Sequence, residues 1–123
     1  MMRTVSFAAI CFAACTAAGV LPALAHAHLQ SAVPPVGGTV SAAPTEVQIK
    51  YSEGVEPRFC SVAVTNAGGA RVDAGAAHIA SGDNTRLIVP LKPLSPGIYH
   101  VEWHATAVDT HKTEGKFDFT VQP

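Results

Sequence analysis

The feature that most constrains this chain is a strict alternation of side-chain character over residues 98–107. Tyr99, Val101, Trp103 and Ala105 share one parity, whereas most of the residues between them are polar. Successive side chains of a β-strand point to opposite faces, so the pattern predicts a strand with one buried and one solvated face. A helix with its period of 3.6 residues would scatter these apolar positions around its surface. The alternation therefore commits this part of the chain to a β-sheet.

Other segments also have the composition of β-strands, and Gly and Pro residues separate them. Short strands punctuated by turn residues predict an all-β fold, a Greek-key β-sandwich or barrel of immunoglobulin type with about seven strands. Only residues 74–77 suggest a helical turn. The further expected strands are 28–32, 46–51, 59–65, 87–89 and 116–121.

The beginning of the chain has the anatomy of a secretory signal peptide. Residues 1–3 provide a cationic start, residues 5–20 an apolar run, and residues 23–25 (ALA) a small-residue cleavage site. We therefore predict a signal peptide over 1–25 and a single small domain over 26–123. No later apolar run is long enough to cross a bilayer, so we expect a soluble protein in the periplasm.

Charge and cysteine content exclude two further classes of protein. The net charge of −1 offers no basic surface for nucleic acid. Cys11 and Cys15 lie within the predicted signal peptide, which leaves Cys60 alone and rules out an internal disulfide. We expect Cys60 to be a small buried residue beside Phe59, and the protein to be a monomer.

Cleavage after residue 25 would give His26 two adjacent nitrogen donors, its α-amine and its own Nδ1. Asp109 and His111 are separated by one residue, and an extended chain would point both side chains the same way. Three nitrogens and a carboxylate suit Cu(II), which prefers a tetragonal set of N and O ligands, better than Zn(II), which prefers a tetrahedron. The sequence thus predicts a Cu(II) site formed by His26, Asp109 and His111.

Two alternatives remain open at this point. Asp109 and His111 are also compatible with an ordinary solvated loop. His28, as the third residue after the predicted cut, could instead complete a chelate in which the N-terminal backbone wraps the metal through deprotonated amides. A strand near His28 would oppose that wrapping.

Several short pieces of the chain occur together in an ordered series. They are HAHL (26–29), Ser31, PP (34–35), YSEGVEP (51–57), LIVPL (87–91), PGIY (96–99), VEWH (101–104) and VDTHKTEG (108–115). The series resembles the CopC-type periplasmic copper-binding proteins, in particular their short YobA-like branch, over essentially all of residues 26–123.

The resemblance implies a β-sandwich that binds one Cu(II) ion tightly through His26, Asp109 and His111. It implies that Glu53 lies near the N-terminus, where it could hydrogen-bond the coordinated amine, and we place His28 beside the site without a bond to the metal. It also suggests a copper-uptake protein of the CopD type in the inner membrane as a partner. Some members have a Met-rich loop for Cu(I), but here Met1 and Met2 both lie in the predicted signal peptide.

Three functions are compatible with these residues. The leading one is a non-enzymatic Cu(II) carrier or buffer in copper tolerance or uptake. The second is a copper-dependent oxidative enzyme, since an N-terminal His also chelates copper in oxidative polysaccharide-cleaving enzymes. Asp109 would fill the position that oxygen needs there, and the chain has few aromatic side chains to stack on a polymer. The third is a structural β-domain whose histidines are incidental.

Overall fold

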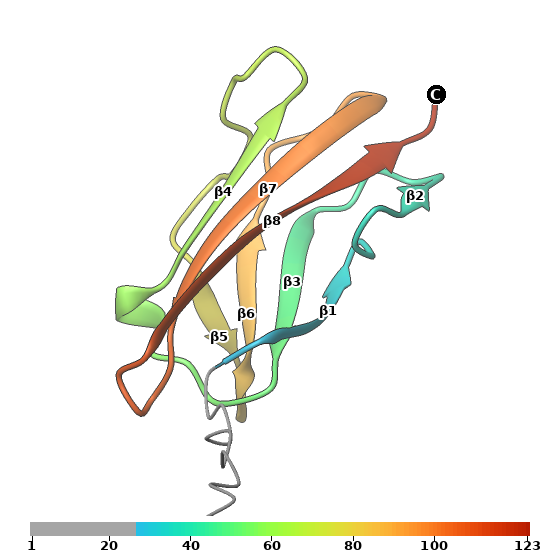
Figure 1. Cartoon of the computed structure of the whole chain (residues 1–123). Coiled ribbons are helices and arrows are strands. Elements are labelled where there is room, and N and C mark those ends of the chain that lie inside the picture. Colours follow the sequence, from blue (N-terminus) through green and yellow to red (C-terminus); the bar gives the residue numbers. More distant parts are fainter. Residues whose placement is uncertain (1–26) are drawn as a thin grey trace, which may run out of the picture.

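The computed structural model describes residues 27–123, which form two four-stranded β-sheets packed face to face (Figure 1). Neighbouring strands are antiparallel except for the parallel pair β2 and β8. One sheet has the order β1 (Leu29–Val33), β3 (Glu46–Tyr51), β6 (Asp83–Pro90), β5 (His78–Ala80). The other has the order β2 (Thr39–Val40), β8 (Lys112–Val121), β7 (Gly97–Thr106), β4 (Ser61–Asn66).

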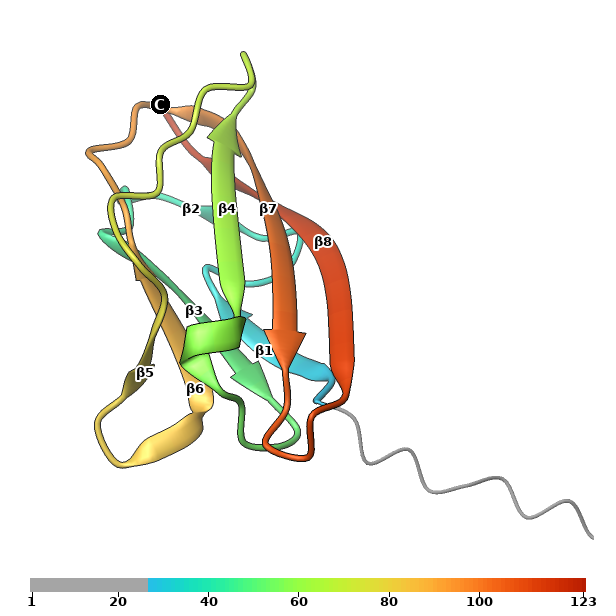
Figure 2. The ribbon, with the colours of Figure 1, turned by 90° about the vertical axis from the view of Figure 1, so that its left-hand side faces the viewer.

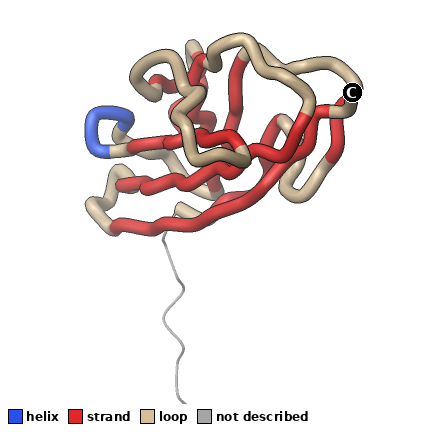
Figure 3. The backbone as a smooth tube through the Cα atoms, turned by 90° about the horizontal axis from the view of Figure 1, so that it is seen from above, coloured by secondary structure: helices blue, strands red, loops and turns tan. Residues whose placement is uncertain are grey.

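This architecture confirms the predicted all-β sandwich, and the sheets do not close into a barrel. The expected strands are all present, but the short strands β2 and β5 were not foreseen. Residues 74–77 form no helix but a loop that leads to β5, and the Ala74 N–H donates to the Pro90 carbonyl of β6 at 2.8 Å. The helical element is instead a 3₁₀ turn, η1 (Pro57–Phe59), at the side of the sandwich (Figure 3).

The alternation over β7 has the predicted orientation. Tyr99, Val101, Trp103 and Ala105 are all buried between the sheets. The Trp103 ring meets Tyr51 edge to face with their centroids 5.4 Å apart, a preferred arrangement for two aromatic rings. Apolar residues of β1, β3, β4, β6 and β8 also contribute to the core.

The opposite face of β7 is polar and solvated, as the alternation predicts. His100 lies across from Asp118 of β8, with 2.7 Å between Nδ1 and Oδ1. His104 lies across from Glu114, with 3.2 Å between Nδ1 and Oε2. His100 and His104 thus each have a cross-strand carboxylate partner on the surface, so their positions need no metal to account for them.

One end of the sandwich collects the segments from which a site was predicted. The described chain begins beside the β7–β8 turn, and the loop after β3 lies at the same end, opposite the C-terminus (Figures 1 and 2). In the part of the chain that the structure describes, no helix is long and apolar enough to cross a membrane.

Candidate metal centre

The β7–β8 turn fixes the position of Asp109 and His111. The Thr110 N–H donates to the Ala107 carbonyl at 2.8 Å, and the Ala107 N–H donates to the His111 carbonyl at 2.9 Å. Thr110, between Asp109 and His111, has a φ of 76° and so adopts the left-handed backbone conformation. A β-branched residue adopts this conformation at a cost of about 1–3 kcal/mol, so the surrounding hydrogen bonds must hold it there.

The turn brings the side chains of Asp109 and His111 together. The distance from His111 Nδ1 to Asp109 Oδ2 is 3.1 Å, and the His111 N–H donates to Asp109 Oδ1 at 3.1 Å. The contact between Asp109 and His111 depends on the tight turn at Thr110, which differs from the extended segment predicted from the sequence. A carboxylate beside an imidazole can orient the ring and raise its basicity as a metal ligand.

The start of the described chain is anchored next to this turn (Figure 2). Ala27 is fully buried, and its carbonyl accepts a 2.7 Å hydrogen bond from the Thr113 hydroxyl. Thr113 lies at the beginning of β8, two residues after His111. The hydrogen bond therefore holds Ala27 close to the turn that carries Asp109 and His111. His26 lies outside the described residues.

His28 is held by its backbone rather than left to wrap an ion. Its N–H donates to the Ser52 hydroxyl at 2.8 Å, and its carbonyl accepts from the Ser52 N–H at 2.8 Å. The wrapped chelate would require the His28 amide to lose its proton and bind the metal. Because that amide already donates to Ser52, the fold opposes the wrapped mode.

The loop after β3 forms another side of this end of the sandwich. The Gly54 carbonyl accepts a 3.0 Å hydrogen bond from the Val108 N–H, and Val55 forms a β-bridge with Ala107. These contacts place half-buried Glu53 in the loop that adjoins the β7–β8 turn. A Cβ at Gly54 would lie 2.4 Å from the end of the exposed Asn84 side chain, so a larger residue there would require Asn84 to move.

The ligating side chains of residues 27–123 do not by themselves complete a metal site. No group of three or more His, Cys, Asp or Glu side chains in this range is arranged to hold an ion. Asp109 and His111 provide one oxygen and one imidazole, which fit Cu(II) but leave part of its coordination to other donors. The predicted donors that would complete the set, the amine and Nδ1 of His26, lie outside the described residues.

Cys60 is half-buried between η1 and β4, and it contacts the hydrophobic core. Its Sγ donates to the Glu56 carbonyl at 3.1 Å and accepts from the Thr106 N–H at 3.4 Å. Burial raises the pKa of the Cys60 thiol, and the Thr106 N–H offsets part of that shift. A thiol that keeps its proton is a poor metal ligand and nucleophile.

Sequence reasoning missed the residues that support the predicted ligands. Ser52 and Thr113 anchor the first residues of the described chain, and Thr110 shapes the turn. Short hydroxyl side chains beside strands have no distinctive pattern, so only the fold could reveal these contacts.

Comparison with known proteins agrees with the geometry. A family model described as the CopC domain matches residues 29–122. This chain belongs to the CopC family. Protein YobA of Escherichia coli strain K12 is 39% identical over 99 residues, which are 80% of this chain and 80% of that protein.

Solved structures of CopC proteins share the fold. The crystal structure of CopC from Methylosinus trichosporium OB3b covers 80% of this chain and 95% of its own, with 31% identity and a TM-score of 0.74. PcoC, a methionine-rich copper resistance protein from Escherichia coli, covers 80% of this chain and 100% of its own, with 31% identity and a TM-score of 0.70. These matches confirm the CopC resemblance and the β-sandwich that it implied.

Proposed function

We propose that this CopC protein binds one Cu(II) ion and acts as a copper carrier or buffer in the periplasm. The ligands are the α-amine and Nδ1 of His26, an imidazole nitrogen of His111 and an oxygen of Asp109. The observation that carries the proposal is the contact between His111 and Asp109 beside the anchored Ala27. The copper-related names of the solved relatives support the choice of metal.

The donor set favours the oxidised ion. Nitrogen and carboxylate donors suit Cu(II), whereas Cu(I) favours soft thioether and thiolate ligands. Both methionines of the chain, Met1 and Met2, lie in the predicted signal peptide. Burial raises the pKa of the Cys60 thiol, which disfavours the thiolate form that copper needs. We therefore propose a single Cu(II) site and no dedicated Cu(I) site.

A carrier fits this site better than an oxidative enzyme. An oxygen-activating copper centre needs an open position on the metal, and Asp109 would occupy that position. Trp103, the single tryptophan, is buried against Tyr51, so it offers no flat surface to a polymer. Oxygen consumption by the copper-loaded protein with a reductant, above that of free copper, would support the enzyme instead.

The proposed function includes export of the protein to the periplasm and delivery of its copper ion to a membrane protein. The signal peptide over residues 1–25 would bring the protein to the periplasm and create the free amine of His26 when it is removed. The resemblance to CopC proteins suggests an inner-membrane copper-uptake protein of the CopD type as the receiver of the ion.

The decisive experiment compares two versions of the protein, one starting at His26 and one with a single Met before His26. The extra residue moves the amine away from the chelate, so we expect tight Cu(II) binding only in the first version. Competition titration against a Cu(II) chelator measures the difference, and mass spectrometry verifies each N-terminus and the copper stoichiometry. Equal affinities in the two versions would rule out the His26 chelate.

A further inference from the structure

The strand β4 lies at the end of its sheet, and within residues 27–123 only the second half of its open edge is covered by another segment. Residues 70–72 run alongside its second half. There the Asn66 N–H donates to the Ala70 carbonyl at 2.9 Å, and the Val72 N–H donates to the Val64 carbonyl at 2.8 Å. The Asp73 side chain then accepts the Val64 N–H at 3.0 Å.

The covering segment leaves β4 after Asp73 and crosses to the other sheet. Asp73 forms a β-bridge with Leu91, and the Ala74 N–H donates to the Pro90 carbonyl at 2.8 Å. Backbone groups of a strand alternate between its two edges with a period of two residues. Val62 therefore presents its N–H and carbonyl on the same side as Val64, where residues 27–123 place no strand beside it.

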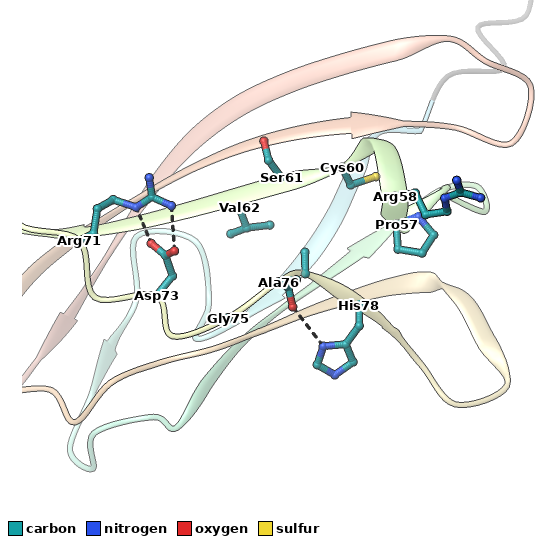
Figure 4. A pocket seen from close by; sticks show the side chains of 11 residues that line it. Pro57, Arg58, Cys60, Ser61, Val62, Arg71, Asp73, Gly75, Ala76 and His78 are labelled. Carbon is teal, nitrogen blue, oxygen red and sulfur yellow. Dashed lines mark hydrogen bonds and ion pairs between the residues drawn. The ribbon is translucent and has the colours of Figure 1, made fainter.

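This uncovered part of β4 opens into a cleft of about 510 Å³ (Figure 4). The start of β4 forms one wall, and the segment that crosses to β5 forms the other. Val62 lines the cleft, and 7% of its surface is exposed. An edge with a free donor and acceptor can bind an added strand unless the protein blocks it.

The charged side chains of the cleft are mostly basic. Arg58, Arg71 and His78 line it together with one carboxylate, Asp73. Asp73 accepts hydrogen bonds from Arg71 Nε at 2.7 Å and Nη2 at 2.8 Å, so these two charges offset each other (Figure 4). The exposed Arg58 is left as the cation available to a ligand.

We propose that the first half of β4 docks an extended, acidic segment of a partner protein. The segment would add antiparallel to β4, in line with residues 70–72, and exchange backbone hydrogen bonds with Val62. Pairing of β4 with a second copy is disfavoured, because it would place the Arg58 cations of both copies in one interface. The docking site lies apart from the candidate metal centre and does not depend on copper.

The test uses nuclear magnetic resonance of the ¹⁵N-labelled protein and a synthetic capped hexapeptide, Thr-Glu-Val-Glu-Val-Glu. We expect the peptide to shift the Val62 amide resonance and to slow its hydrogen exchange. The same peptide with Lys in place of Glu should bind at least about fivefold more weakly. Arg58→Glu should weaken binding of the acidic peptide about fivefold, whereas Lys116→Glu, the same charge change on β8, should leave it unchanged.

The proposal is overturned by any of three results. The first is an unchanged Val62 amide at millimolar acidic peptide, and the second is equal affinity for the acidic and basic peptides. The third is a Val62 shift that grows with protein concentration in the absence of peptide, which would indicate a second copy as the occupant. The unperturbed spectrum of each variant verifies that it is folded.

Discussion

Thr110 shows how a single residue shapes the candidate metal centre. Its positive φ reverses the chain tightly enough for Asp109 to accept the His111 N–H and to contact His111 Nδ1. Nδ1 of His111 is engaged by this contact, so Nε2 is the nitrogen that we expect to bind Cu(II) if the ring keeps this orientation. In the proposed site Asp109 would have two roles, as an orienting partner of His111 and as an oxygen donor to the metal.

Single substitutions of the predicted ligands should separate these roles. We expect His111→Ala to weaken Cu(II) binding by more than about 100-fold, which exceeds the usual effect of a supporting residue. Asp109→Ala should cost less, because an oxygen donor is lost while the nitrogens remain. His28→Ala should change affinity little, since the substitution keeps the backbone N–H and carbonyl that hydrogen-bond Ser52. Competition titrations of the three variants provide the measurement.

The opposite ranking would identify a different site. A large loss with His28→Ala and none with His111→Ala would favour the chelate in which the N-terminal backbone wraps the metal. His104→Ala is the matched control, because His104 is an exposed histidine on the outer face of β7 with its own carboxylate partners.

At the scale of elements, the site depends on the junction between the start of the chain and β8. The hydrogen bond from Thr113 to the Ala27 carbonyl ties two segments that are 86 residues apart. Gly115 lets β8 lie directly on the Trp103 ring, since a Cβ there would approach a ring carbon to 2.6 Å. The beginning of β8 thus packs on Trp103 through Gly115 and hydrogen-bonds the N-terminal segment through Thr113.

Loss of the hydrogen bond between Thr113 and Ala27 should weaken copper binding more than it destabilises the fold. In Thr113→Val the shape of the side chain is kept but the hydroxyl donor is lost, so Ala27 is held less firmly beside the start of β8. We expect a five- to tenfold weaker Cu(II) affinity, which corresponds to about 1 kcal/mol for one hydrogen bond. Thr120→Val, on the same strand but at its other end, is the control. Equal copper affinity in both variants would show that the anchor is irrelevant to the site.

At the scale of the whole molecule, polar contacts between strands add a pH-dependent contribution to the stability of the sandwich. Asp83 of β6 accepts hydrogen bonds from the Thr85 N–H and hydroxyl, and it pairs with Lys50 of β3 at 3.3 Å. These interactions, those with Thr85 first, lower the pKa of Asp83 to about 2. A carboxyl with a lowered pKa stabilises the fold when ionised.

The direction of this pH dependence follows from the difference between the pKa of Asp83 in the folded and in the unfolded protein. An unfolded Asp has a pKa of about 3.9. The contribution of Asp83 is therefore complete above about pH 4 and is lost as the pH falls toward 2. We expect Asp83→Asn to lower the melting temperature at neutral pH and to flatten its decline between pH 4 and 2. Circular dichroism melts at several pH values measure this, and an unchanged acid decline in the variant would refute the assignment.

The sequence by itself determined the fold class and the faces of the long strands. Alternation in β3, β7 and β8 assigned the buried and the solvated side chains correctly, because a strand's period of two is a local property. The short strands β2 and β5 were not predicted, because two or three residues contain too little pattern to indicate a strand. In addition, β2 pairs with β8, which lies far along the chain. The same alternation located Trp103 in the core and His104 on the surface.

For the candidate site, too, one part was predicted from the sequence and another part became visible only in the fold. Residue types and spacing predict Asp109, His111 and His26 as ligands, and the structure brings Asp109 and His111 into contact. Only the tertiary structure decided that a positive-φ turn joins Asp109 to His111, and that Thr113 holds Ala27 beside them. Such contacts join segments that no local pattern relates, so they arise only when the two sheets pack and bring the chain's beginning against β8.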